Sequence, residues 1–142
     1  MPNELTRFRA VLLLFEEVFK VPHGANMADG YLQKLLENPT FIVMDALLEG
    51  ECVGGLSAYV MSNYFSERPF IYLFDLAVKE SVQRQGIGTN LVQTLKDRGR
   101  RLYSSEVFVQ ADLADAHALN FYKKIGGIPE SVVHYTFDLE KE

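Results

Sequence analysis

The stretch VQRQGIGTN at residues 82–90 constrains the fold most, because it joins two elements of different kinds. An apolar run, FIYLFDLAV at 70–78, comes before it, and a helix-like stretch, NLVQTLKDRGRR at 90–101, follows it. The apolar run is typical of a central strand that is buried on both faces. Gly86 and Gly88 therefore stand in a connection from a strand to a helix, where residues without a Cβ permit unusual backbone angles.

Two glycines in such a connection have several explanations. A plain turn needs only the conformational freedom of glycine. The phosphate-loop spacing G-x-x-x-x-G-K-[ST] is absent, and the dinucleotide fingerprint G-x-G-x-x-G fails because Leu91 stands at the third glycine position. A metal-free pyrophosphate cradle fits better, since backbone N–H groups at a helix entrance converge on a phosphate and Arg84 adds a charged donor.

Length, charge and cysteine content bound the class of protein. A chain of 142 residues without repeats, low-complexity tracts or linkers is most simply one domain, residues 1–142. The 14 basic and 19 acidic residues give a formal charge of −5, which argues mildly against a nucleic-acid partner and for cationic ligands. No apolar run is long enough to cross a membrane, no signal-peptide core is present, and Cys52 is the single cysteine. We therefore expect a cytoplasmic protein with no membrane partner.

The hydrophobic pattern predicts an order of two helices, three strands, a helix, a strand, a helix and a strand. The helices are expected over about 5–19, 30–37, 89–101 and 116–125, with Asp29 capping the second and Asp115 the fourth. The strands are expected over 40–50, 51–61, 70–78, 105–110 and 131–139, the first two as a hairpin. This order predicts an α/β or α+β fold built on a mixed sheet.

Two separated motifs resemble those of one family. Gln83-Arg84-Gln85-Gly86-Ile87-Gly88 is similar to the Q/R-x-x-G-x-G/A signature of the GNAT acetyltransferase superfamily, and ALNFYKKIGG at 118–127 is similar to its A-x-x-F-Y-x-x-x-G segment. Over roughly 28–139 the chain most closely resembles the small, GNAT-type aminoglycoside 3-N-acetyltransferases. The resemblance implies the GNAT fold, a mixed, mostly antiparallel central sheet flanked by about four helices. Here the first strand would be short or missing.

The resemblance also implies a cosubstrate and its binding residues. Acetyl would pass from acetyl-CoA to an amine by direct attack within a ternary complex, without a metal. The phosphates would be bound mostly by backbone N–H groups of Arg84, Gln85, Gly86, Ile87, Gly88 and Thr89. The pantetheine arm would pair with a splayed strand at Leu76, Ala77 and Val78, whose N–H groups could polarise the thioester carbonyl. Asn120 would be a further contact, although it fits a solvent-facing helix position equally well.

Asp75 is the one acid inside the apolar strand, and its burial needs an explanation. An ionised carboxylate in such a place is costly unless it is paired, so a bond to a backbone group or an arginine would account for it structurally. An ordinary alkylamine is mostly protonated near neutral pH, and a nearby carboxylate can take its proton. The resembling enzymes carry an acid at this position beside the substrate amine. We therefore expect Asp75 to be the general base and to anchor the amine.

Other polar residues receive less definite roles. Tyr122, at the tyrosine of the family's F-Y segment, is expected to protonate the departing thiolate, unless it only fills core or surface. Asp112 and Asp115 are expected on the substrate side, because acids suit ammonium groups. His134, which alternates with apolar neighbours in SVVHYTF, is expected to line the same side. Asp29 and Glu67 are more simply solvated acids. The three histidines, at 23, 117 and 134, show no metal-ligand spacing, and Cys52, which lacks an adjacent base, is favoured as a small buried hydrophobe.

Several functions remain open on these residues. The leading hypothesis is an aminoglycoside 3-N-acetyltransferase acting on a cationic small molecule, and thus an enzyme of antibiotic resistance. Another is an acetyltransferase for a polyamine, a peptide lysine or a protein N-terminus. A non-catalytic acyl-CoA-binding module and an interaction subunit belong to other classes. A homodimer is compatible with the family, whose members are often dimers.

Overall fold

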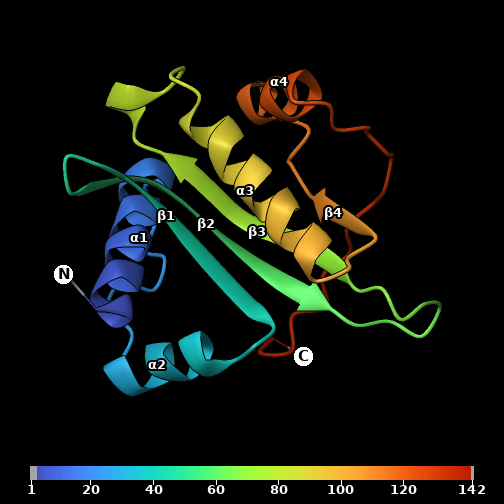
Figure 1. The fold of residues 1–142 in the computed structure, drawn as a ribbon, viewed down its shortest axis with the longest axis horizontal. Helices are drawn as coiled ribbons and strands as arrows, with labels where there is room; N and C mark the ends of the chain where they lie inside the picture. Colours follow the sequence, from blue (N-terminus) through green and yellow to red (C-terminus); the bar gives the residue numbers. More distant parts are fainter. Residues whose placement is uncertain (1–2, 142) are drawn as a thin grey trace. The chain divides into compact units, whose positions relative to one another are not determined.

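The computed structural model describes residues 3–141. The chain divides into two compact units, Met1–Gln110 and Ala111–Glu142, and each is described by itself. The first unit contains α1 (Glu4–Phe19), α2 (Asp29–Glu37), β1 (Phe41–Leu48), β2 (Glu51–Met61), β3 (Phe70–Val78), the 3₁₀ turn η1 (Glu80–Val82), α3 (Ile87–Arg101) and β4 (Glu106–Val109) (Figure 1). The second unit contains α4 (Ala116–Lys124). None of the helices described is both long and apolar enough to span a membrane.

The four strands form one mixed sheet in the order β1-β2-β3-β4. β1 and β2 pair antiparallel, as do β2 and β3, whereas β3 and β4 pair parallel. The β1–β2 hairpin turns at Glu49 and Gly50, whose φ angles of 51° and 82° are both positive. Positive φ at both central residues is the requirement of a type I′ hairpin turn, which matches the twist of the flanking strands. The mixed, mostly antiparallel sheet of the GNAT fold is confirmed.

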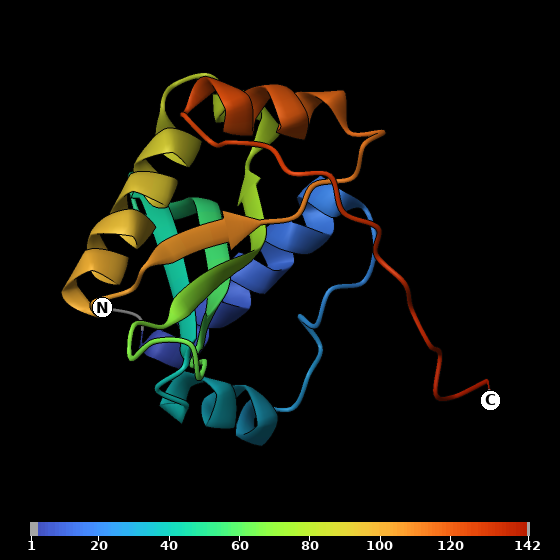
Figure 2. The ribbon, with the colours of Figure 1, turned by 90° about the vertical axis from the view of Figure 1, so that its right-hand side faces the viewer.

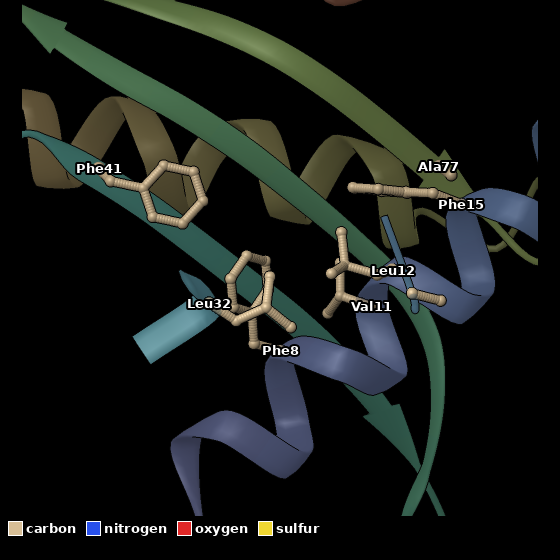
Figure 3. Packing of buried hydrophobic residues seen from close by; sticks show 8 residues of the cluster. Phe8, Val11, Leu12, Phe15, Leu32, Phe41 and Ala77 are labelled. Carbon is tan, nitrogen blue, oxygen red and sulfur yellow. The ribbon is translucent and has the colours of Figure 1, made fainter. Parts of the chain in front are cut away.

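The helices of the first unit cover both faces of this sheet (Figures 1 and 2). A Cβ on Gly54 would lie 3.0 Å from Ile87 of α3, while a Cβ on Gly55 would lie 2.8 Å from Val11 of α1. Because neighbouring residues of a strand point to opposite faces, α1 and α3 lie on opposite sides of β2. The core on the α1 side is a cluster of apolar side chains (Figure 3), which includes Phe8, Val11, Leu12, Phe15, Leu32, Phe41 and Ala77.

A β-bulge in β3 sets the direction of Asp75. Ser57 of β2 is opposite Asp75 while Ala58 is opposite Leu73, which leaves Phe74 as an extra residue in β3. Before the bulge, Ile71 packs toward α3, where a Cβ on Gly99 would meet it; after the bulge, Ala77 belongs to the core cluster beside α1. An extra residue shifts the alternation of side chains by one position. Asp75 therefore shares the α1 face of the sheet with Ala77.

Two local expectations are corrected by the structure. β3 is not buried on both faces, because Phe74 at the bulge is 52% exposed. Asp29 does not cap α2, since Ala28 is the N-cap residue and Asp29 is the first residue of the helix. Its carboxylate instead forms an ion pair with Arg9 of α1. An acid in the first turn stabilises a helix through the helix dipole even when it does not cap the helix. Asp29 is such an acid in α2.

The predicted strand at 131–139 is also wrong. The structure assigns no strand to these residues, and α4 is the last element that it describes. Val132 and Tyr135 are 71% and 79% exposed, and Phe137 and Leu139 are similarly open. Alternating apolar residues indicate that the side chains of a segment suit a pleated, half-buried strand. A strand also needs a partner for its backbone N–H and C=O groups. Within the described residues this segment has no such partner strand.

Candidate active site

The glycine segment, residues 82–90, leads into α3, whose first turn has no side-chain cap. Arg84 and Gly86 both have positive φ, 68° and 83°, so the chain turns sharply just before the helix. Gly86 is the N-cap residue, no side chain caps the helix, and the first backbone bond runs from Asn90 N to Gly86 O at 2.9 Å. Within residues 3–141 the N–H groups of Ile87 and Gly88 have no acceptor. Free N–H groups at the positive end of a helix form a site suited to a phosphate.

The glycine segment is fixed to the end of β3. The side chain of Gln83 donates from Nε2 to the carbonyl oxygen of Val78 at 2.9 Å. Arg84, one residue further on, is exposed to solvent. Thr89 is exposed in the first turn of α3, and Gln85 is exposed beside Gly86. The candidate phosphate-binding residues therefore lie together, within one unit of the structure, after the short turn η1 that follows β3.

One edge of β3 is open beside this segment. β4 pairs only with residues 70–73 of β3, and the last pair is Leu73 with Val109. On the other edge Leu76, Ala77 and Val78 pair with β2 as far as Gly54. The second half of β3 thus has one paired edge and one edge without a strand partner in the described residues. Such an edge offers backbone N–H and C=O groups to an extended ligand, as predicted for the pantetheine arm.

Asp75 lies in the second half of β3 and is paired with a histidine. Its Oδ2 is 2.6 Å from Nε2 of His23, and the side chains of His23 and Asp75 are 27% and 19% exposed. Neither a backbone group nor an arginine is its partner, so the structural explanations weighed for this carboxylate do not apply. Asp75 also lies near the phenol of Tyr59 in β2. Burial raises the pKa of Tyr59, and Tyr31 and the Asp75 carboxylate raise it further.

The loop that carries His23 is held by α1. Glu16 accepts hydrogen bonds at Oε2 from the backbone N–H groups of His23 and Ala25, at 2.8 and 3.0 Å. These two bonds lower the pKa of Glu16. Sequence reasoning missed His23, because 52 residues separate it from Asp75. The sequence offered only weak signals. The loop follows α1 directly, and Glu16 near the end of α1 is close enough in sequence to bond the backbone of the loop.

The remaining candidates belong to the second unit. Asp115 caps α4 as predicted, accepting from Ala118 N at 3.0 Å, and Asp112 accepts from Ala114 N at 2.9 Å. Tyr122 is half-buried in α4, where its ring contacts that of Phe121, while Asn120 is exposed. His134 is exposed in the segment after α4. Both aspartates therefore have local bonds to backbone groups, and the substrate and cofactor roles of all these residues stay predictions.

The described residues give little support to a cysteine nucleophile or a metal site. Burial, together with the nearby carboxylate of Asp45, raises the pKa of the Cys52 thiol, which keeps it protonated and unreactive. Between residues 3 and 141 no cluster of His, Cys, Asp and Glu is arranged to hold a metal ion. A cavity of about 240 Å³ is lined by residues of α1 and β1, including Phe8 and Asp45, but by none of the glycine segment.

The fold and the motifs agree with one family. The chain belongs to the acetyltransferase (GNAT) family, whose sequence model matches residues 8–127. Acetyl-CoA is the acetyl donor in this family. Among curated proteins, the uncharacterized N-acetyltransferase YvbK of Bacillus subtilis (strain 168) is 27% identical over 108 residues, which are 72% of this chain and 70% of YvbK.

Solved structures give a closer match. The aminoglycoside acetyltransferase meta-AAC0020, from an uncultured soil metagenomic sample, is 42% identical with a TM-score of 0.92, and the match covers 96% of this chain and 91% of that one. The same enzyme has been solved in complex with sisomicin. AAC(6')-Iy in complex with CoA, at 19% identity and a TM-score of 0.78, covers 94% of this chain and 88% of its own, and shows the fold alone. The predicted resemblance to the GNAT superfamily and its aminoglycoside acetyltransferases is confirmed.

Proposed function

We propose that this protein moves acetyl from acetyl-CoA to the 3-amino group of 2-deoxystreptamine aminoglycosides such as gentamicin, and so confers antibiotic resistance. The observation that carries the proposal is the position of Asp75. This carboxylate stands on β3 within the stretch whose edge is open, and the chain continues from the end of β3 to the uncapped start of α3. The similarity to an aminoglycoside acetyltransferase solved with sisomicin supports a small cationic substrate. In this proposal residues 1–142 form one catalytic domain in the cytoplasm, compatible with a homodimer.

The chain's own groups divide the work of binding. Backbone N–H groups from Arg84 to Thr89 bind the phosphates of the donor, with the Arg84 guanidinium beside them. The edge of β3 at Leu76, Ala77 and Val78 aligns the pantetheine arm, and an N–H group there stabilises charge on the carbonyl oxygen. Asn120 adds a contact to the same arm. The donor supplies an activated acetyl group when bound, and these groups fix its direction relative to Asp75.

Asp75 then binds the amine and takes its proton. A carboxylate is an effective anchor for an ammonium group, because charge-assisted hydrogen bonds are the strongest of their kind. Once the proton has left, the nitrogen lone pair can attack the thioester carbon directly. Asp112, Asp115 and His134 extend the acceptor surface for the other ammonium groups of a polycation. A substrate with several amines is then oriented by more than one contact, which favours one amine for acetylation.

The Tyr122 hydroxyl is proposed to protonate the departing thiolate. Replacing Tyr122 by Phe is expected to lower kcat about tenfold or more, because water must then supply the proton, while the KM for acetyl-CoA changes little. Steady-state kinetics with saturating amine measure both quantities. Tyr135→Phe serves as a matched control outside the proposed site, and it is expected to match the unsubstituted enzyme. An unchanged kcat for Tyr122→Phe would contradict the assignment.

The identity of the acetylated amino group tests the most specific part of the proposal, the 3-amino position. Gentamicin or sisomicin is incubated with the enzyme and acetyl-CoA, and the product is mapped by NMR. The expected product carries the new acetyl on the 3-amino group. Acetyl at the 6'-amino group would overturn the position while keeping the class of substrate. Acetylation of spermidine or a lysine-rich peptide in place of either antibiotic would overturn the substrate class itself.

A further inference from the structure

The His23–Asp75 contact has no role in the acetyl transfer described so far. The 2.6 Å separation of Nε2 and Oδ2 is short for a hydrogen bond between a nitrogen and an oxygen. Both side chains are mostly removed from solvent. No lysine or arginine in residues 3–141 forms an ion pair with Asp75. The imidazole is therefore the side-chain partner of this carboxylate within the described residues.

The ring of His23 is held in place from two directions. Glu16 fixes the loop by accepting from the backbone N–H of His23 itself. The ring also packs edge-on against Phe15, at 5.6 Å between centroids, and against Phe19, at 5.2 Å. Aromatic rings prefer such edge-to-face arrangements. With its backbone bonded and its faces packed, the imidazole has little freedom to turn away from Asp75.

The charged and titratable groups around the pair come from three elements. Glu16 of α1 lies beside the backbone of His23, whose N–H group it accepts a hydrogen bond from at 2.8 Å. Tyr59 of β2 feels the charge of Asp75, and Tyr31 of α2 acts in turn on Tyr59. The phenol of Tyr59 stays neutral at physiological pH, because phenols ordinarily titrate near ~10 and the pKa of Tyr59 is raised. Within residues 3–141, Glu16 is therefore the charged group beside the pair, and no lysine or arginine forms an ion pair with Asp75.

We propose that His23 and Asp75 act as one proton-accepting pair, in which His23 holds Asp75 in place and receives the proton that Asp75 takes from the amine. The inference rests on the proposed acetyl transfer to an amine. When the bound ammonium is deprotonated, an N–H bond breaks and its electron pair stays on nitrogen. The proton bonds first to Oδ1 of Asp75 and then passes through solvent water to Nδ1 of His23, because Nε2 of the neutral ring already carries the hydrogen that it donates to Asp75. Carboxylate and neutral imidazole become carboxylate and imidazolium, so the pair loses its net negative charge. The partly exposed ring then returns the proton to water.

The advantage of the pair lies in its match to the working pH. An isolated carboxyl of Asp titrates near ~3.9 and an isolated imidazole near ~6.5, and a general base is most effective when it titrates near the operating pH. Coupled groups titrate together, so the behaviour belongs to the pair and not to either residue. His23 thus holds one carboxylate oxygen in place and offers a second group that can take up the proton.

Two substitutions of His23 separate positioning from proton uptake. His23→Gln keeps a hydrogen-bond donor for Asp75 but removes the titrating ring, whereas His23→Leu removes both. For His23→Gln we expect kcat at neutral pH to fall about tenfold, and the acidic limb of kcat/KM against pH to move to lower pH by at least about one unit, since the carboxylate then acts alone. His23→Leu is expected to show the same shift with a larger loss of kcat. His117→Gln on α4 is the control, with an unchanged profile.

An acidic limb that stays in place for His23→Gln would overturn the inference, because the ring would then be only a structural neighbour. A second measurement needs no substrate. In NMR spectra of the enzyme, the ring N–H proton bonded to Asp75 is expected far downfield and slow to exchange, and Asp75→Asn, which leaves only a neutral acceptor, is expected to move that signal upfield. Its absence from the unsubstituted enzyme would overturn the pair even if the enzyme is active. If the downfield N–H signal is present but the enzyme acetylates no amine, the proposed function is refuted, and the proton-accepting role is refuted with it.

Discussion

Replacing Asp75 by Asn is expected to lower kcat for aminoglycoside acetylation by a factor on the order of 10² to 10⁴, the usual contribution of a general base. Asn is nearly isosteric and can still accept a hydrogen bond from His23, so the fold should be preserved. It cannot take a proton from the substrate ammonium, and it no longer offers a charge to anchor it. KM for the antibiotic should therefore rise as well.

The measurement for Asp75→Asn is kcat and kcat/KM across the pH range, with acetyl-CoA binding measured separately by calorimetry. Acetyl-CoA affinity is expected to be unchanged, because Asp75 is assigned to the amine and not to the phosphates. Asp97→Asn is the matched control, since Asp97 is an exposed acid of α3 that, among residues 3–141, pairs with its helical neighbours Gln93 and Arg100. Full activity of Asp75→Asn at every pH would show that another group takes the proton.

Replacing Gly86 by Val is expected to weaken acetyl-CoA binding roughly tenfold or more. Gly86 has a φ of 83°, a conformation that a β-branched residue adopts only under strain of about 1–3 kcal/mol. No atom lies within 4 Å of the position a Cβ would occupy, so the effect comes from the backbone and not from crowding. A loop that relaxes to negative φ would turn the free N–H groups before α3 away from the phosphates.

Calorimetric titration with acetyl-CoA measures this loss, and circular dichroism checks that the fold is intact. Gly30→Val is the matched control, because Gly30 lies in α2 without positive φ and with no atom within 4 Å of a Cβ. Its affinity for acetyl-CoA is expected to equal that of the unsubstituted protein. Equal affinity for Gly86→Val would refute the assignment of the glycine segment to the phosphates.

Local features were readable from the sequence. The apolar run, the two glycines and the helix after them became β3, the uncapped turn at Gly86 and α3, since each depends on neighbouring residues alone. The hairpin at Glu49 and Gly50 and the Asp115 cap are of the same kind. Periodicity and turn chemistry act over a few residues, and a single sequence records them directly.

Features that depend on distant contacts were not readable. The direction of a strand side chain is inferred from the alternation of residues between the two faces of the sheet, and the bulge at Phe74 interrupts that alternation. The face on which Asp75 lies could therefore be found only from the structure. The bond from His23 to Asp75 joins a loop and a strand 52 residues apart. Residues 131–139 carry a strand-like pattern, but whether a strand forms depends on a partner that the pattern does not name.

The central claim is that this chain transfers acetyl from acetyl-CoA to an aminoglycoside. It is tested most directly by thiol release from acetyl-CoA at fixed enzyme concentration, with gentamicin, kanamycin, spermidine and a lysine-rich peptide assayed side by side. The account predicts rapid turnover with gentamicin and little with spermidine or the peptide. Acetyl-CoA binding without turnover on any of the four would contradict it, and would leave the glycine segment as the cradle of a protein that binds the cofactor without using these amines.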